Sequence, residues 1–292
     1  MAPPSEFVPV TERHDVYPAI SPEPHFANKT FKGKVVFLAG ASKGIGREIA
    51  TFYAKAGASV TVTARQQKPL DELRTDILRQ VPNAQVLTVS VDVTKIKDVE
   101  AAVKATVETF GKLDIALANA GAIGRGERLL AEEDPDEWWG VMEVNIRGVY
   151  NVAHTTLPHL VKTKGYFFAT ASLASQQRVP KFSSYQLSKH ALNRLIELIA
   201  LEYPDVKVFA LHPGLVKTDL SLKNAERGGY LDWLVDTPQL AAATALYLSA
   251  GKADWLCGRF VMSTWDLEEL ERNWKSKILD EEALINRLAV PS

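Results

Sequence analysis

Short apolar stretches alternate with amphipathic stretches from residue 34 to residue 262. The first apolar stretch, Val35–Ala39, is uninterrupted, which is typical of a strand buried on both faces of a sheet. Amphipathic stretches such as Arg47–Ala54, Val99–Phe110 and Ala191–Leu201 repeat apolar residues at helical spacing. Further strands are predicted at Val60–Thr63, Val86–Val89, Ile115–Ala118, Tyr166–Ala169, Val206–Ala210 and Arg259–Met262.

Strands that alternate with helices are typical of parallel βαβ units. We therefore expect an α/β fold: a single Rossmann-like, doubly wound parallel sheet of about seven strands, flanked by helices on both faces. This domain would span residues 34–262. A proline-rich arm (residues 1–33) precedes it and a tail (residues 263–292) follows it. The apolar residues of the arm suggest that it lies on the body of the protein.

The composition is that of an ordinary globular protein, with 46% hydrophobic and 24% charged residues and a net charge of −1. The charge gives no reason to expect nucleic acid as a partner. One cysteine, Cys257, excludes an intramolecular disulfide and favours a reducing compartment. No apolar stretch approaches the ~20 residues of a membrane span, and residues 1–7 do not resemble a secretory signal. We expect a cytoplasmic protein.

A glycine-rich turn follows the first predicted strand, with the spacing Gly40-x-x-x-Gly44-x-Gly46. Glycines here permit a tight turn and a close approach of the backbone to a pyrophosphate, and the following helix presents free N–H groups to it. A dinucleotide site is therefore predicted. The alternative is a glycine-rich turn without a ligand.

The second strand ends at Thr63-Ala64-Arg65, without the acidic residue that would bind the ribose diol of NAD. A guanidinium can instead bind a 2′-phosphate, and Lys43 could add a second positive charge. The sequence therefore predicts NADP(H). The alternative is that both residues are ordinary solvated basic residues.

Tyr185 and Lys189 are four residues apart, so they share one face of a helix. A nearby cation favours the phenolate and should lower the pKa of Tyr185. Most such pairs are solvated surface residues, so the spacing by itself indicates little.

Together with the glycine turn, this pair resembles the short-chain dehydrogenase/reductase family over roughly residues 34–262. Two positions depart from the family motifs, Ala39 and Ala118, which stand where the family has threonine and asparagine. The resemblance implies that the cofactor contacts Gly40, Ser42, Lys43, Gly44, Ile45, Gly46, Arg65, Asp92, Val93, Asn119, Ala120, Gly121, Tyr185, Lys189, Pro213, Gly214, Val216 and Thr218.

The resemblance also implies an enzyme that interconverts a ketone or aldehyde and an alcohol. Tyr185 would be the general acid or base, Lys189 would lower its pKa and hold the ribose, and Ser172 would bind the substrate oxygen. Asn145 would hold a water that links Lys189 to solvent. Two alternatives stay open: a non-catalytic NADP-binding sensor or scaffold, and a cofactor-assisted cyclase or dehydratase.

The family places a mobile flap over the substrate, here at about residues 219–237. Its apolar residues could line a pocket for an apolar small molecule, or form one face of a short helix packed on the core; they are Leu222, Tyr230, Trp233 and Leu234. The resemblance implies a homodimer or homotetramer paired through residues 137–162 and 183–202. The six histidines lack a metal-ligand spacing, so no metal is expected.

Overall fold

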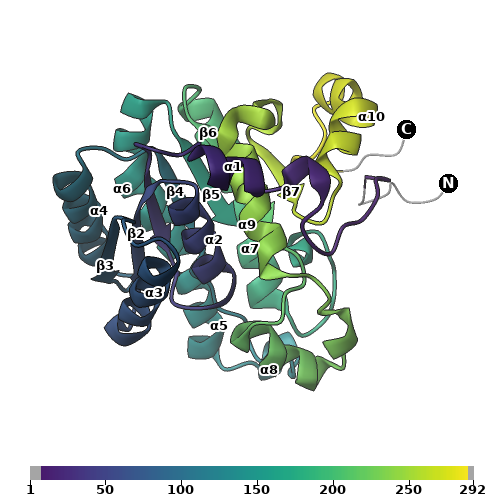
Figure 1. The fold of residues 1–292 in the computed structure, drawn as a ribbon. Helices are drawn as coiled ribbons and strands as arrows, with labels where there is room; N and C mark the ends of the chain where they lie inside the picture. Colours follow the sequence, from purple (N-terminus) through teal and green to yellow (C-terminus); the bar gives the residue numbers. More distant parts are fainter. Residues whose placement is uncertain (1–7, 289–292) are drawn as a thin grey trace.

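The computed structural model describes residues 8–288 and contains one parallel sheet of seven strands in the order β3-β2-β1-β4-β5-β6-β7 (Figure 1). The strands are β1 (Val35–Ala39), β2 (Ser59–Ala64), β3 (Val86–Ser90), β4 (Ile115–Ala118), β5 (Tyr166–Thr170), β6 (Lys207–His212) and β7 (Arg259–Met262). The chain reverses direction across the sheet between β3 and β4, as in a doubly wound fold. The predicted fold class is confirmed.

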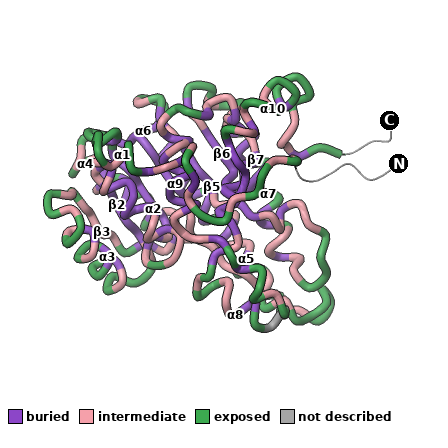
Figure 2. The backbone as a smooth tube through the Cα atoms, turned by 45° about the vertical axis from the view of Figure 1, so that its right-hand side comes forward, coloured by how far each residue is buried: buried purple, intermediate pink, exposed green. Residues whose placement is uncertain are grey.

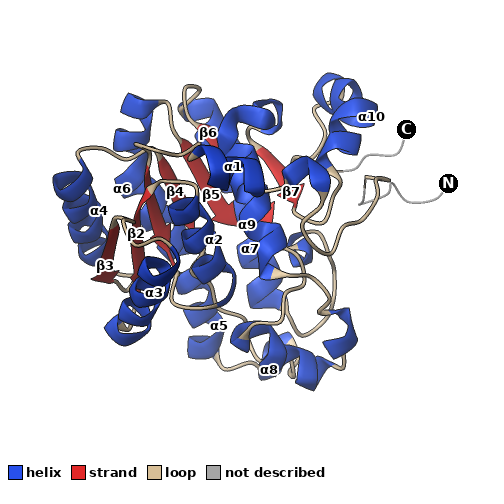
Figure 3. Ribbon diagram, viewed as in Figure 1, coloured by secondary structure: helices blue, strands red, loops and turns tan. Residues whose placement is uncertain are grey.

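Helices cover both faces of the sheet (Figure 3). One layer contains α2 (Gly44–Lys55), α3 (Gln67–Gln80) and α9 (Pro238–Tyr247), and α2 packs against both of the others. The other layer contains α4 (Ile96–Phe110), α6 (Gly148–Thr163) and α7 (Ser183–Glu202). This sandwich explains why the strands are almost continuously apolar.

The core lies between these layers (Figure 2). All residues of β1 and β4 are buried, whereas edge strand β3 is only half-buried. Phe167 of β5 and Phe209 of β6 are fully buried, and Phe209 stacks on Phe168 with ring centroids 5.3 Å apart. Burying each phenylalanine contributes about 2 kcal/mol, so these central strands form a rigid base for the loops at their ends.

The tail and the first part of the arm lie beside the segment that follows β7, and the rest of the arm packs against α2. The arm contains a 3-10 helix, η1 (Pro18–Ile20), and a short helix, α1 (Glu23–Asn28), where the sequence indicated irregular structure. Tyr17 and Ile20 are buried in the main core. The tail forms α10 (Leu267–Asp280) and then returns, so that Leu284 accepts a hydrogen bond from the backbone of Phe260 in β7. Residues 1–7 of the predicted arm and 289–292 of the predicted tail lie outside the described residues.

Two helices lie beyond the carboxyl ends of the strands, at the bottom of Figure 1: α5 (Pro135–Met142) and α8 (Asp219–Gly228). In an open α/β sheet, ligands bind at this edge. The remaining short elements are the 3-10 helices η2 (Leu130–Glu132), η4 (Leu173–Ser175), η5 (Leu231–Trp233) and η7 (Asp254–Leu256), and the π-helices η3 (Glu143–Arg147) and η6 (Leu248–Lys252).

Candidate active site

The glycine turn joins β1 to α2 and is packed so closely that its glycines cannot carry side chains. A Cβ on Gly46 would overlap the carbonyl oxygen of Gly40, and one on Gly40 would lie 2.5 Å from the backbone nitrogen of Ala120. The Asn119 side chain donates to the Gly40 carbonyl at 2.8 Å and accepts from Thr170 Oγ1 at 3.0 Å. Asn119 therefore links the turn to the ends of β4 and β5. The backbone of the turn can approach a pyrophosphate.

The residues predicted to bind the adenine half of the cofactor lie at the ends of β2 and β3. Asp92 accepts hydrogen bonds from the backbone and hydroxyl of Thr94, at 3.0 and 2.8 Å. The Val93 carbonyl accepts from Asn151 at 2.8 Å. Arg65 is exposed at the end of β2, close enough to Asp92 to favour its charged form. The structure therefore brings Arg65, Asp92 and Val93 to one place.

The Lys43 side chain is not free beside the predicted adenine site, because it is paired. Its ammonium forms a 2.7 Å ion pair with Asp219, the first residue of α8, and both side chains are about two-thirds exposed. A Cβ on neighbouring Gly44 would lie 2.9 Å from Cγ2 of Thr218. The glycine turn and the beginning of the flap are therefore in contact.

Tyr185 and Ser172 are brought together although they come from different elements. Tyr185 lies in the first turn of α7, and Ser172 caps η4 just after β5, where its Oγ accepts from the Ala174 backbone at 3.2 Å. The Ser172 hydroxyl lies close enough to Tyr185 to lower the pKa of its phenol. Tyr185 is partly buried and Ser172 is 9% exposed.

Lys189 is buried one helical turn further along α7. Its ammonium donates to the carbonyl of Thr170 at 2.6 Å and lies 5.7 Å from the centre of the Tyr185 ring. Burial lowers the pKa of Lys189 to about 8. Burial also raises the pKa of Tyr185, against the lowering effect of the Ser172 hydroxyl. This direction is opposite to the one that the Tyr–Lys spacing predicts, because spacing carries no information on desolvation.

Asn145 lies in π-helix η3, a local distortion that is frequent at functional sites. Its side chain is fully buried, accepts from the Ala122 backbone nitrogen at 2.8 Å, and donates to the Ala122 carbonyl and to Ser188 Oγ, each at 2.9 Å. It thus joins the Gly121–Ala122 loop after β4 to α7. A Cβ on Gly121 would lie 3.7 Å from the Lys189 ammonium, so Asn145, Gly121 and Lys189 adjoin one another. The predicted water relay stays a prediction.

The segment after β6 contains the last group of predicted cofactor residues. Pro213, Gly214 and Val216 are buried, and Gly214 has a φ of +96° with the Asp236 side chain packed against it. Thr218 caps α8, with its hydroxyl accepting from the Ser221 backbone at 3.2 Å. The segment is therefore a fixed turn that leads into the flap.

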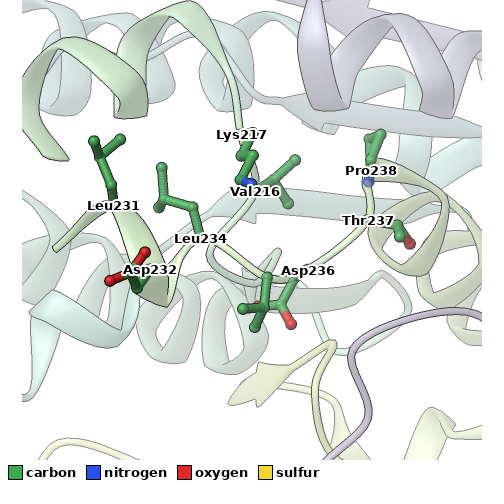
Figure 4. A pocket seen from close by; sticks show the side chains of 9 residues that line it. Val216, Lys217, Leu231, Asp232, Leu234, Asp236, Thr237 and Pro238 are labelled. Atoms are coloured by element: carbon green, nitrogen blue, oxygen red, sulfur yellow. The ribbon is translucent and has the colours of Figure 1, made fainter. Parts of the chain in front are cut away.

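The flap forms α8 and η5, and its apolar residues have different environments. Tyr230 lies close enough to Tyr185 to affect its ionisation. Leu234 is buried and lines a pocket of about 440 Å³ with residues 216–217, 231–232 and 235–238 (Figure 4), whereas Trp233 is 65% exposed. This pocket includes Val216 of the predicted cofactor residues but not Tyr185. Leu234 thus packs inward and Trp233 does not, and the role of the flap in substrate binding stays a prediction.

Four residues near the site are additions to the sequence-based set: Thr170, Asn151, His212 and Asp236. His212 is buried at the end of β6, where burial, followed by the nearby Lys189, lowers its pKa to about 3. It is therefore neutral at physiological pH. The position of His212 before Pro213 in the sequence does not indicate that this histidine is buried and neutral.

Within residues 8–288, no set of three or more histidine, cysteine or acidic side chains is arranged to hold a metal ion. None of the helices there is both long and apolar enough to cross a membrane.

Comparison with known proteins identifies the family. The family model "short chain dehydrogenase" matches residues 34–228. Short chain dehydrogenase pigC of Monascus ruber is 37% identical over 274 residues, covering 89% of this chain and 87% of that protein.

Two solved structures are similar in fold. The 3-ketoacyl-(acyl-carrier-protein) reductase from Brucella melitensis, complexed with NADH, has a TM-score of 0.72 and 26% identity, over 80% of this chain and 97% of that one. The alcohol dehydrogenase from Thermococcus sibiricus, complexed with 5-hydroxy-NADP, has a TM-score of 0.68 and 29% identity, over 78% and 95%. The resemblance seen in the sequence is confirmed, and the chain belongs to the short chain dehydrogenase family of oxidoreductases.

Proposed function

We propose that this protein is an NADP(H)-dependent enzyme that interconverts a ketone or aldehyde and an alcohol. The observation that carries the proposal is the arrangement of Ser172, Tyr185 and Lys189. A partly buried phenol lies near a serine hydroxyl that lowers its pKa, and a buried ammonium lies one helical turn away. A purely structural tyrosine needs neither neighbour.

Tyr185 would transfer the proton. Since burial raises its pKa, the phenol is protonated at neutral pH and can donate to a carbonyl oxygen that gains negative charge. The Ser172 hydroxyl would bind the same oxygen, and Lys189 would keep a positive charge beneath it. Alcohol oxidation would use the deprotonated phenol as the base.

The glycine turn fits a dinucleotide. A Cβ at Gly40 would meet the backbone of Ala120 and one at Gly46 would meet the Gly40 carbonyl, so only glycines allow this tight turn before the N-terminus of α2, where a pyrophosphate could bind. When bound, a nicotinamide cofactor supplies or accepts the hydride. Arg65 at the end of β2, with no acidic residue at the strand tip, supports NADP(H) over NAD(H). The family neighbours include complexes with both kinds of nucleotide, so they do not decide between them.

The substrate would be a mainly apolar small molecule. The flap carries several exposed apolar side chains near the same edge of the sheet as Tyr185, namely Leu220, Leu231, Trp233 and Val235. An apolar substrate would cover such residues on binding. The single cysteine supports a cytoplasmic location.

A homodimer or homotetramer that pairs through α6 and α7 is part of the proposal. These two helices expose apolar side chains at Tyr150, Val161, Leu187, Leu198 and Leu201. Pairing with a second copy would bury them.

The test is consumption of NADPH by the purified protein with a panel of apolar ketones and aldehydes. We expect turnover with at least one compound, and faster turnover with NADPH than with NADH. Binding of NADPH without turnover across the panel would favour a non-catalytic binder, and a product without net oxidation of NADPH would favour a cyclase or dehydratase. A strong preference for NADH would contradict the cofactor assignment.

A further inference from the structure

Asp236 connects the N-terminal arm to the segment that follows β6. Its side chain is buried and packs against Gly214. One carboxylate oxygen accepts from the Leu215 backbone nitrogen at 2.5 Å, and the other lies 2.7 Å from Nδ1 of His14, in the arm. Because a carboxylate only accepts, His14 is the donor. Each oxygen of the buried Asp236 carboxylate therefore accepts one hydrogen bond, one from the arm and one from the segment that follows β6.

Backbone hydrogen bonds connect the same segments as the Asp236 side chain. The Asp236 nitrogen donates to the Leu215 carbonyl at 3.2 Å, and Val216 and Asp236 form a parallel bridge. On the other side, the Thr237 nitrogen donates to the His14 carbonyl at 3.0 Å. Residues 236–237 therefore lie between the arm and residues 215–216. The arm ribbon passes beside Asp236 and Thr237 in Figure 4.

The arm has a second, separate attachment. Arg13 forms a 2.7 Å ion pair with Asp266, which caps α10, and the Arg13 backbone nitrogen donates to the Thr264 carbonyl at 2.7 Å. Arg13 and His14 are thus neighbours that each contact a buried aspartate, but only the aspartate of His14 holds the segment after β6. The family model begins at residue 34, so this arm lies outside the part of the chain that the family defines.

We propose that His14 and Asp236 are positioning residues for the cofactor. His14 orients the Asp236 carboxylate, which fixes the Leu215 N–H and with it the buried turn from Pro213 to Thr218. This inference rests on the proposed use of that turn in cofactor binding. It assigns to the arm a role in the active site in addition to its packing on the core.

A purely structural arm would behave differently. In that case, loss of either contact would lower stability, and neither would change cofactor affinity selectively. Arg13 therefore provides a matched control on the same arm. His14→Leu removes the donor and keeps an apolar bulk, whereas His14→Asn keeps an amide donor near the position of Nδ1.

The experiment measures the dissociation constant of NADPH by fluorescence for the wild type, His14→Leu, His14→Asn and Arg13→Leu. We expect His14→Leu to weaken binding about fivefold, the effect of one hydrogen bond of ordinary net strength, and His14→Asn to restore most of the affinity. Arg13→Leu should lower the melting temperature and leave the affinity unchanged.

A second readout needs no cofactor. Hydrogen exchange of the backbone amides of residues 214–218 in the cofactor-free protein should be faster in His14→Leu and unchanged in Arg13→Leu. Unchanged affinity and exchange in His14→Leu, or equal effects of the two leucine variants, would overturn the inference. If the wild type binds neither NADPH nor NADH, the proposed function fails instead, and the exchange measurement still decides whether His14 orders the turn.

Discussion

Lys43 and Asp219 are 176 residues apart in the sequence, and their side chains form a 2.7 Å ion pair. Lys43 belongs to the glycine turn after β1 and Asp219 begins α8 of the flap. The Lys43 ammonium lowers the pKa of Asp219, so the pair stays charged at neutral pH. If Lys43 is a ligand of the 2′-phosphate, Asp219 competes with the cofactor for the same ammonium.

Asp219→Asn should therefore improve the use of NADPH. The ammonium is released for the phosphate, so we expect the KM for NADPH to fall about threefold while that for NADH stays the same. Lys43→Met should have the opposite effect, raising the KM for NADPH alone. Steady-state kinetics with both nucleotides measures this. Equal changes for NADPH and NADH would mean that Lys43 does not contact the 2′-phosphate.

Tyr185→Phe tests the proton donor. Only the hydroxyl is lost, so the fold should be kept while the rate of carbonyl reduction falls about 10²- to 10⁴-fold, the usual contribution of general acid catalysis. NADPH should still bind, and binding by fluorescence serves as the control for a folded site. Near-wild-type turnover would show that another group supplies the proton.

The fold could be predicted from the sequence because the sandwich of helices makes each strand a continuous apolar run. Val35–Ala39 is an example, since all five residues are buried. The glycine turn was also visible, because its close packing excludes side chains at Gly40 and Gly46.

Contacts between distant segments could not be predicted. The pairing of Lys43 with Asp219, and of Asp236 with His14, depends on how loops meet after folding. The raised pKa of Tyr185 in the cofactor-free protein could not be predicted either, since its main cause is burial, which a helical spacing does not show. Asn145 was expected to hold a water, but no pattern indicated that its side chain would join the β4 loop to α7.

Gly46→Ala tests the close packing of the glycine turn. The added methyl group would overlap the Gly40 carbonyl, so the turn must shift, and we expect a loss of about 1–3 kcal/mol in unfolding free energy together with loss of NADPH binding. Gly140→Ala in α5 is the matched control. That glycine is exposed and nothing approaches its Cβ position, so alanine should be neutral or stabilise by about 0.5–1 kcal/mol. Unimpaired NADPH binding by Gly46→Ala would argue against a pyrophosphate at this turn.

Lys189→Met should stabilise the cofactor-free protein while abolishing turnover. Burial lowers the pKa of Lys189 from 10.5 to about 8, so at pH 7 the folded protein holds a charge that would be better solvated in the unfolded chain. Removing it should raise the unfolding free energy by on the order of 2 kcal/mol at pH 7, allowing for loss of the hydrogen bond to Thr170.

The pH dependence distinguishes this effect from a change in packing. Between about pH 8 and 10.5 the unfolded chain binds more protons at Lys189 than the folded protein, so the stability of the wild type rises with pH relative to the variant. The advantage of Lys189→Met should therefore be complete below pH 8 and shrink as the pH approaches 10.5. Urea unfolding at pH 7 and pH 10 measures the difference, with Lys104→Met, at an exposed position on α4, as the control that should show no such trend. If the advantage were the same at both pH values, the charge of the buried ammonium would not be its cause.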